Sequence, residues 1–337
     1  MVRYSLLDLA PVPEGATAGD ALQNALDLAR HAERWGYHRF WMAEHHNMPG
    51  IASAATAVAL AHVGAGTSTI RIGAGGVMLP NHAPLVIAEQ FGTLEALHPG
   101  RVDLGLGRAP GTDGATARAL RLRHDAPDEF PQDVMELMSY FDDLHPEHPI
   151  RAVPGQGAKV PIYILGSSLY GAQMAAYFGL PYAFASHFAP ALLDEALSIY
   201  RANFRPSARL DAPYAIMAAG LAAAETDREA EYHRSSQVLA FANLRLGRPG
   251  KLPRPVDDVA ARVPPAALAQ AEAALGCAAV GSPATVRRRL RELIEAHKPD
   301  EVMLTGMIHD HAARLRSFEI GAEAMRDLAE CEPAAAS

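Results

Sequence analysis

The stretch Phe40–His46 (FWMAEHH) is an aromatic and apolar run that ends in a carboxylate and two imidazoles. Its apolar residues predict a buried strand, and Glu44, His45 and His46 follow where that strand ends. Barrels and open parallel sheets keep their sites at the carboxyl ends of their strands, and histidine is the side chain that titrates near neutral pH without help. An isolated histidine is more often a core or helix-cap residue, but this position favours a functional site.

Seven further apolar stretches predict strands that alternate with helices. Besides the run that starts at Phe40, the predicted strands occupy residues 3–10, 70–79, 102–107, 160–165, 182–185, 214–222 and 301–304. The first four strand–helix units follow one another at a spacing of roughly thirty residues, which is typical of right-handed parallel crossovers. Eight such units predict a (β/α)8 TIM barrel. An open doubly wound sheet with a cap is the alternative.

The predicted barrel forms one domain that spans residues 1–330. Stretches rich in glycine, proline and charge predict insertions near 109–131, 146–160 and 246–280. The prolines of residues 246–265 mark a surface excursion within the last insertion and make it a candidate mobile lid. The alanine-rich end of the chain, residues 331–337, is predicted to be a disordered tail.

Composition excludes several classes of partner. The 337 residues carry a formal charge of -8, which argues against nucleic acid or an anionic membrane surface. Cys277 and Cys331 lie far apart and show no metal-like spacing, which suits a reducing compartment. The apolar stretch 51–66 is too short to cross a bilayer, and the amino-terminal stretch has Asp8 inside its apolar run, unlike a secretory signal. We therefore expect a soluble cytoplasmic protein.

Glycines interrupt the predicted strand in Ile70–Val77 (IRIGAGGV). Because glycine weakens a strand, Gly73, Gly75 and Gly76 are difficult to explain by packing alone. One interpretation is that a large flat ligand lies against bare backbone, with a non-proline cis bond at Gly75–Gly76. The other is a bulge or a tight corner of the barrel.

Arg108 follows the predicted strand 102–107, in which Gly105 and Gly107 share one face. A guanidinium at a strand end offers a fork of donors to a phosphate or a carboxylate. Gly105, Gly107 and Gly111 also resemble a dinucleotide fingerprint. That interpretation is disfavoured, because the motif should open the first crossover of the fold and the segment that follows it here is irregular and contains proline.

A second candidate anion site follows the strand at 160–165. Ser167 and Ser168 lead directly into a helix that contains Gly171, and a helix start offers free N–H groups to an anion. Ordinary capping by either serine is the alternative. Near the end of the chain, His309 and His311 form an H-x-H pair that is found in barrel metallohydrolases, although His311 could instead cap the last helix.

Taken together and in order, these stretches resemble the bacterial luciferase-like flavin monooxygenases, specifically their unspecialised bacterial branch. The resemblance covers nearly the whole chain and is carried by Phe40–His46, Ile72–Pro80, Leu79–His82, Ala88–Leu94, Gly100–Arg108, Val280–Pro283 and His309–Leu315. It implies a barrel that binds reduced FMN, supplied by a separate flavin reductase. It also implies that dioxygen forms a flavin peroxide, which attacks an aldehyde or another small organic substrate. Similar proteins are usually homodimers.

The resemblance also implies roles for individual residues. His45 is the catalytic acid–base, Glu44 is its neighbour at the flavin, and Gly75–Gly76 is the unusual peptide beneath the ring. The phosphate is held by Arg108, Ser167, Ser168 and Gly171, and no metal is expected. The chain departs from light-emitting luciferases, which carry a reactive cysteine where Gly107 stands, so light emission is not expected.

Three other functions stay open at this point. The first is a deazaflavin-dependent oxidoreductase on the same barrel, which transfers hydride without oxygen. The second is a flavin-binding or storage protein without catalysis, against which the presence of His45 and Glu44 argues. The third is a metallohydrolase that uses His309 and His311.

Overall fold

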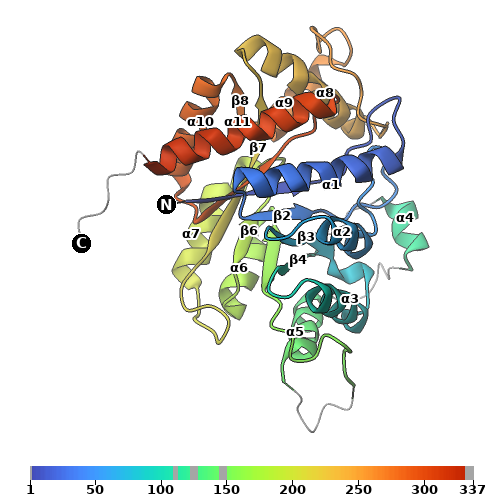
Figure 1. Cartoon of the computed structure of the whole chain (residues 1–337), viewed down its shortest axis with the longest axis vertical. Coiled ribbons are helices and arrows are strands. Elements are labelled where there is room, and N and C mark those ends of the chain that lie inside the picture. Colours follow the sequence, from blue (N-terminus) through green and yellow to red (C-terminus); the bar gives the residue numbers. More distant parts are fainter. Residues whose placement is uncertain (1, 109–112, 122–127, 144–149, 331–337) are drawn as a thin grey trace.

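The strands of the computed structural model form a closed parallel barrel (Figure 1). The structure describes residues 2–108, 113–121, 128–143 and 150–330. In this part of the chain the strands are β1 (Arg3–Asp8), β2 (Arg39–Met42), β3 (Arg71–Met78), β4 (Val102–Gly107), β5 (Ile162–Gly166), β6 (Tyr182–Phe184), β7 (Ala215–Ala223), β8 (Ala278–Gly281) and β9 (Glu301–Thr305). The predicted tail, 331–337, and parts of the first two predicted insertions lie outside the described residues.

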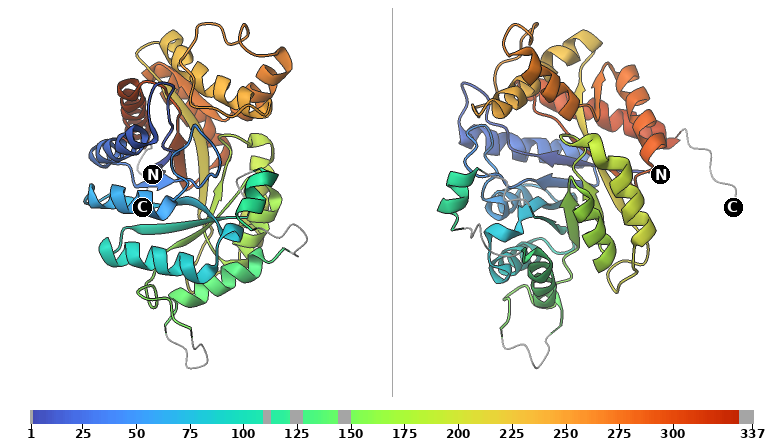
Figure 2. Two further views of the ribbon diagram at one scale, coloured as in Figure 1. Left: turned by 90° about the vertical axis from the view of Figure 1, so that its right-hand side faces the viewer. Right: turned by 180° about the vertical axis from the view of Figure 1, so that it is seen from behind.

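Helices surround the barrel on its outer side, as Figure 1 and the two further views of Figure 2 show. They are α1 (Ala18–Trp35), α2 (Thr56–Ala65), α3 (Pro84–Leu97), α4 (Gly114–Ala119), α5 (Phe130–Phe141), α6 (Leu169–Phe178), α7 (Leu193–Asn203), α8 (Asp227–Arg245), α9 (Pro265–Ala274), α10 (Pro283–His297) and α11 (His311–Glu330), with short 3-10 turns η1 (Leu79–Asn81) and η2 (Pro190–Leu192). The predicted (β/α)8 barrel is therefore confirmed.

Eight strands close the barrel in the order β1 to β7 and then β9. The closure is made by β9, which pairs in parallel with both β1 and β7. The additional strand, β8, pairs with the carboxyl-terminal part of β7 through Gly220–Ala223. The sequence pattern does not predict β8, because this strand has only four residues (AAVG). One of them is β-branched and none is aromatic.

Alternating residues of each strand face two different cores. In β2, Phe40 and Met42 belong to the large core between the barrel and its helices, whereas Trp41 belongs to the cluster inside the barrel. The period of two residues along a strand produces this division. The inner cluster consists of Leu7, Trp41, Ala43, Tyr163, Ala183, Ile216, Ala218 and Met303.

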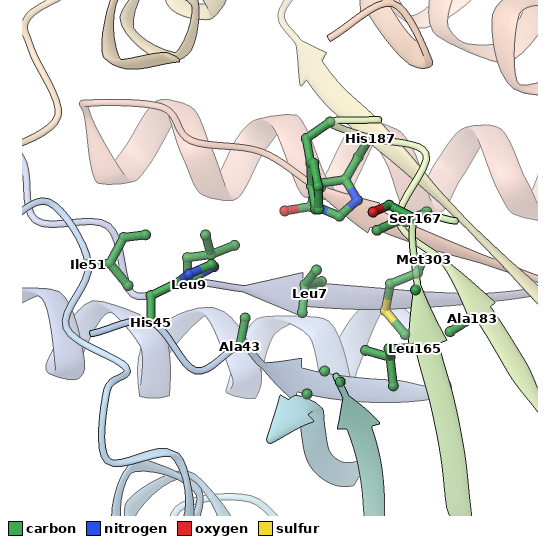
Figure 3. Close-up of a pocket in the computed structure, with 18 of the residues that line it drawn as sticks. Leu7, Leu9, Ala43, His45, Ile51, Leu165, Ser167, Ala183, His187 and Met303 are labelled. Atoms are coloured by element: carbon green, nitrogen blue, oxygen red, sulfur yellow. The ribbon is translucent and has the colours of Figure 1, made fainter. Parts of the chain in front are cut away.

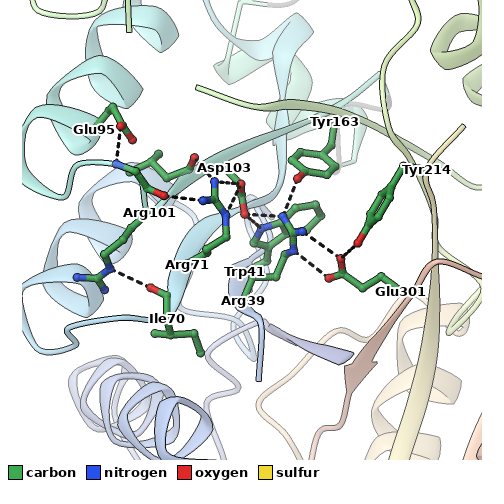
Figure 4. A network of polar contacts seen from close by, with 12 residues as sticks. Arg39, Trp41, Ile70, Arg71, Glu95, Arg101, Asp103, Tyr163, Tyr214 and Glu301 are labelled. Atoms are coloured by element: carbon green, nitrogen blue, oxygen red, sulfur yellow. Dashed lines mark hydrogen bonds and ion pairs between the residues drawn. The ribbon is translucent and has the colours of Figure 1, made fainter. Parts of the chain in front are cut away.

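Below this cluster, at the amino-terminal end of the barrel, buried charges form a closed network (Figure 4). The Arg39 guanidinium, 2% exposed, donates to Glu301 at 2.8 Å, to Asp103 at 2.7 Å and to the Tyr163 hydroxyl at 2.7 Å. Tyr214 donates to Glu301 at 2.7 Å. The pKa of Tyr163 rises to about 12, because burial and the neighbouring Asp103 disfavour its phenolate.

Residues 246–265 are the predicted surface excursion and candidate lid. They are hydrogen-bonded to the connection between β1 and α1. Leu252 donates its N–H to the Val12 carbonyl and accepts from Glu14, at 2.9 Å and 2.8 Å. The remainder of the predicted insertion folds as α9 and β8. These contacts bring the end of α8 and the chain that follows it to the mouth of the barrel.

Candidate functional site

A cavity of about 830 Å³ opens at the carboxyl ends of the strands (Figure 3). Its wall combines residues of β3 and residues that follow β2, β4, β5 and β6, together with residues of α8. The predicted site residues that line it are His45, Gly75, Gly76, Arg108, Ser167, Ser168 and Gly171. Residues from four different strand ends therefore meet in one cavity, which is the arrangement that the sequence reading required.

The floor of the cavity contains the Gly75–Gly76 peptide, which is cis. A Cβ atom on Gly75 would lie 2.8 Å from Leu7 Cδ1 and 2.9 Å from Trp41 Cε3, and one on Gly76 would lie 2.7 Å from the Gly105 carbonyl oxygen. Real Cβ contacts are not this short. Close packing inside the barrel therefore leaves no room for a side chain at either glycine. The backbone of Gly75 and Gly76 itself forms this part of the cavity floor.

Glu44 lies behind the wall, and its side chain is 2% exposed. Its Oε1 is 2.7 Å from His46 Nε2 and 2.9 Å from His82 Nε2, while Asn81 Nδ2 donates to it at 3.1 Å and the Met78 N–H donates to Oε2 at 3.0 Å. Burial alone would raise the pKa of Glu44, but the hydrogen bonds from His82, His46 and Met78 outweigh it and lower the pKa. The carboxylate therefore ties the loop after β2 to the loop after β3.

The hydrogen bonds of Glu44 hold the loop that carries His45, and His45 lines the cavity. The Glu44 N–H donates to the Gly76 carbonyl at 3.1 Å, which joins the imidazole-bearing loop to the glycine floor. Glu44 is predicted to contact the cofactor, yet among the described residues it does not line the cavity. Figure 3 shows His45 beside Leu9 and Ile51.

Glu44, His46 and His82 also offer ligand atoms that lie within 4.8 Å of one another. A carboxylate and two imidazoles are a donor set that binds divalent metals. The separations of 2.7 and 2.9 Å between the Nε2 atoms and the shared oxygen are, however, those of direct hydrogen bonds. Hydrogen bonding accounts for this cluster without an ion.

The predicted phosphate end lies between β4 and α6. The Arg108 guanidinium stacks 4.2 Å from the Tyr170 ring centroid, and its Nη1 donates to Asp128 at 3.2 Å. Ser168 is the N-cap residue of α6, but in the described part of the chain its hydroxyl makes no capping hydrogen bond. Gly171 lies in the first turn of that helix. A guanidinium, serine hydroxyls and a helix amino terminus converge here, and together they suit a phosphate.

His187 also lines the cavity, and the sequence reading missed it. Burial, together with the nearby His45, lowers its pKa to about 4, so the imidazole is neutral at physiological pH. Its Nδ1 is buried and has no hydrogen-bond partner within the described residues. His187 follows β6 just as His45 follows β2, so the same signal of an imidazole after a buried strand could have identified it.

His309 and His311, the pair considered for a metal, contact different partners. His309 Nε2 lies 3.2 Å from the Glu14 carbonyl oxygen, and His311 Nε2 lies 2.9 Å from Asp27 Oδ2. His311 is the first residue of α11. His309 therefore contacts the connection after β1, and His311 joins α11 to α1, and these contacts favour the interpretation as structural residues.

Comparison with known proteins identifies the family. Residues 2–297 match the family described as luciferase-like monooxygenase, so this chain belongs to that family of oxidoreductases. It is 52% identical over 329 residues to a luciferase-like monooxygenase of Escherichia coli (strain K12), which covers 97% of this chain and 98% of that protein. It is 38% identical over 255 residues to the N-acetyl-S-alkylcysteine monooxygenase of Bacillus subtilis (strain 168), covering 74% and 75% of the two chains.

Solved structures agree with this assignment. The structure of apo-MsnO8 superposes with a TM-score of 0.85 at 35% identity, covering 97% of this chain and 99% of that one. Two more distant structures share the fold alone and carry different cofactors. A Baeyer–Villiger monooxygenase component from Pseudomonas putida in complex with FMN has a TM-score of 0.66 at 18% identity, covering 96% and 97%. An F420-dependent secondary alcohol dehydrogenase has a TM-score of 0.68 at 16% identity, covering 97% and 99%.

Within the described residues, no helix has both the length and the apolar character needed to cross a bilayer.

Proposed function

We propose that this enzyme is an FMN-dependent monooxygenase, which uses reduced flavin and dioxygen to oxidise a small organic substrate. In the overall reaction, reduced FMN, dioxygen and the substrate give oxidised FMN, the oxygenated substrate and water. The observation that carries the proposal is the meeting of a glycine floor, the His45 imidazole and an anion-binding end in one cavity. A flat isoalloxazine ring with a phosphate tail matches this combination.

Each part of the cavity has a chemical task. Arg108 and the amino terminus of α6, with Ser167 and Ser168, bind the phosphate. The Gly75–Gly76 peptide supports the ring, and apolar residues of the wall exclude water from the reacting atoms. The bound reduced flavin supplies the two electrons that activate dioxygen.

His45 is the proposed acid–base residue, because its imidazole lines the cavity. Its neighbours Glu44 and His46 are hydrogen-bonded to each other outside the cavity. It holds or delivers the proton that the departing oxygen atom needs to leave as water. His187, which is neutral, lies in the same wall and offers one hydrogen bond to the substrate. Glu44 acts through the loop that it fixes and is thus a positioning residue.

FMN is favoured over a deazaflavin because the phosphate end combines a guanidinium with a helix amino terminus, which suits a terminal dianion. The Escherichia coli relative at 52% identity and the Bacillus subtilis relative at 38% identity are both named as monooxygenases, which use dioxygen. A deazaflavin-dependent hydride transfer is the second candidate, since an F420-dependent enzyme shares the fold. A non-catalytic flavin-binding protein is the third.

The substrate and the partners belong to the same proposal. An aldehyde-like compound is one candidate, and a thioether is another, since a relative is named for oxygenating N-acetyl-S-alkylcysteine. We further propose that a separate reductase supplies the reduced flavin, that residues 1–330 form one domain, and that the enzyme is a homodimer. A cytoplasmic location fits Cys277, which is a free, buried thiol.

Oxygen uptake tests the proposed reaction. The purified protein is mixed anaerobically with reduced FMN or with reduced F420, and dioxygen and a thioether or an aldehyde are then added. We expect substrate-dependent formation of the oxygenated product with FMN only. Product formed with F420 in the absence of dioxygen, or binding of FMN without any turnover, would contradict the proposal.

A further inference from the structure

We propose that the substrate sharing this cavity with the flavin is an organic carboxylate with an apolar body, and that Arg245 and Gln237 of α8 bind its carboxylate. This assignment rests on the proposed function, because it concerns the part of the cavity that the flavin does not use. It names a binding site on α8, an element that the sequence reading did not connect with the site.

One stripe of α8 faces the cavity. Gln237, Phe241 and Arg245 are spaced four residues apart, so they lie on the same face of the helix. All three line the cavity. The Arg245 guanidinium lies 5.2 Å from the Phe241 ring centroid, which holds the cation against an aromatic face. An amide and a guanidinium on one helix face can bind the two oxygens of a carboxylate.

This stripe belongs to a different side of the barrel mouth than the proposed phosphate end. Arg108 and Ser168 follow β4 and β5. In the closed barrel, β1 and β9 are the strands opposite β4 and β5. The chain that leaves α8 after Arg245 pairs at Leu252 with the connection after β1, through the Val12 carbonyl. The two guanidinium groups thus belong to elements on different sides of the barrel mouth and line one cavity.

The charges of the wall favour anionic ligands at both ends. Among the described residues that line the cavity, the charged side chains are Arg108 and Arg245, and none is Asp or Glu. Arg108 has an acidic partner in Asp128, whereas Arg245 has no carboxylate within 4.0 Å among the described residues. An unpaired guanidinium beside a cavity without acids is a site for an anion.

Apolar side chains outside α8 also line the cavity. The lining includes six such side chains: Leu9, Met48, Ile51, Leu252, Leu275 and Met307. A ligand that fills this part must bury an apolar body and keep its charge at the Arg245 end. A small carboxylate without such a body would leave the apolar side chains uncovered. An apolar compound without a charge would leave the Arg245 guanidinium without an anion.

A simpler role for Arg245 is possible on general grounds, because a cation in the last turn of a helix stabilises the helix dipole. That role does not distinguish a carboxylate ligand from its ester. Arg248 provides the matched control, since it is an exposed arginine like Arg245, three residues further along, but does not line the cavity.

The carboxylate does not react in the proposed oxygenation. For a thioether carboxylate, the sulfur lone pair forms the new S–O bond as the O–O bond breaks. The second oxygen atom leaves as water, with the two electrons supplied by reduced FMN. Arg245 and Gln237 only fix the end of the substrate that is remote from the sulfur.

The test compares acids with their methyl esters. FMN-loaded and flavin-free protein are titrated calorimetrically with N-acetyl-S-benzylcysteine and with octanoate, and then with the methyl ester of each. We expect the acids to bind at least roughly tenfold more tightly than the esters. Arg245→Gln should remove this preference by weakening acid binding roughly 10- to 100-fold. Arg245→Lys should retain part of the preference, and Arg248→Gln should leave it intact.

Oxygen uptake with reduced FMN is measured on the same samples, so that the two proposals can fail separately. Three results would overturn the carboxylate site even if dioxygen is consumed. The acids and esters bind equally well, neither acid binds, or Arg245→Gln lowers the affinities for acids and esters by the same factor. A preference for acids that depends on Arg245 supports the site. Should that preference occur without oxygen uptake, the proposed reaction is wrong and the anion site stands.

Discussion

At the amino-terminal end of the barrel, Arg39 is bonded to Asp103, Glu301 and Tyr163, and each of these buried groups has a partner (Figure 4). At the carboxyl-terminal end, His45 and Arg108 line a cavity of about 830 Å³, and Figure 3 shows the part of this cavity that contains His45. Polar side chains thus project into the same barrel at both ends. At the amino-terminal end they form hydrogen bonds and ion pairs with one another. At the carboxyl-terminal end they line a cavity that a ligand can fill.

The difference separates stability from function. Buried charges that are fully paired contribute to one folded arrangement, and removing one partner leaves the others unpaired. Groups that face a cavity are available to a ligand, and their substitution is expected to change binding or catalysis more than folding. Trp41 joins the two regions, because its Nε1 donates to Asp103 at 3.1 Å while its ring lines the cavity.

The largest expected effect on stability lies at the closed end. Arg39→Leu leaves the carboxylates of Asp103 and Glu301 buried without their main cation, and we expect the free energy of unfolding to fall by about 3–5 kcal/mol. Urea denaturation measures this loss. Arg287→Leu, which removes an exposed pair with Asp327, should cost no more than about 1 kcal/mol. Equal losses in the two variants would show that the network does not stabilise the barrel.

At the open end, His45→Asn should act on turnover. We expect kcat to fall roughly 10²- to 10⁴-fold, because the proposed acid–base group is lost. Binding of reduced FMN and the free energy of unfolding should stay near the wild-type values. His62→Asn, a change at an exposed position on α2, serves as the control. An unchanged kcat in His45→Asn would remove this residue from the proposed mechanism.

His187 makes the stability of the open end sensitive to acid. Its pKa is about 4 in the folded protein and near 6.5 when unfolded, so between these values the unfolded chain binds the proton and the folded protein does not. The folded state therefore loses up to about 3 kcal/mol as the pH falls from 6.5 to 4. His187→Gln should lose less stability than wild type between pH 7.5 and pH 4.5 in urea denaturation. Parallel losses in the two proteins would contradict the assignment of a buried, neutral imidazole.

The smallest of these effects concerns the phosphate end. Arg108→Gln should weaken binding of reduced FMN roughly 10- to 100-fold, because a charge-assisted hydrogen bond is lost. Arg205→Gln is a matched control, since Arg205 also lies over a tyrosine ring, that of Tyr177, but does not line the cavity. Anaerobic titration measures both affinities. If the two variants bind FMN equally well, Arg108 does not hold the phosphate.

The sequence predicted the fold well wherever a local pattern was strong. The continuous apolar run at 160–165 became β5, and the strand that begins at Phe40 became β2. The short strand β8 was missed because its residues have little strand preference. Helix α1 begins at Ala18, four residues before its apolar period starts at Leu22, because Thr17 and Asp20 form a capping box.

The site was predictable where chemistry follows a strand directly. His45, Arg108 and Ser168 were found in this way, and all three line the cavity. Glu44 follows the same strand, but its carboxylate is turned toward His46 and His82, and such orientation depends on tertiary contacts that no local pattern contains. The α8 stripe was missed because its contact with the cavity depends on how the helix packs over the barrel, and no local sequence pattern contains this.

The central claim is that the open end of the barrel binds FMN, and Trp41 can report it directly. The chain has two tryptophans, so Trp35→Phe leaves Trp41 as the only one. Anaerobic titration of this variant with reduced FMN should quench Trp41 emission to saturation, because the ring lines the floor of the cavity beside Gly75. Reduced F420 should cause no saturable quenching. Saturable quenching by F420 together with none by FMN would contradict the account.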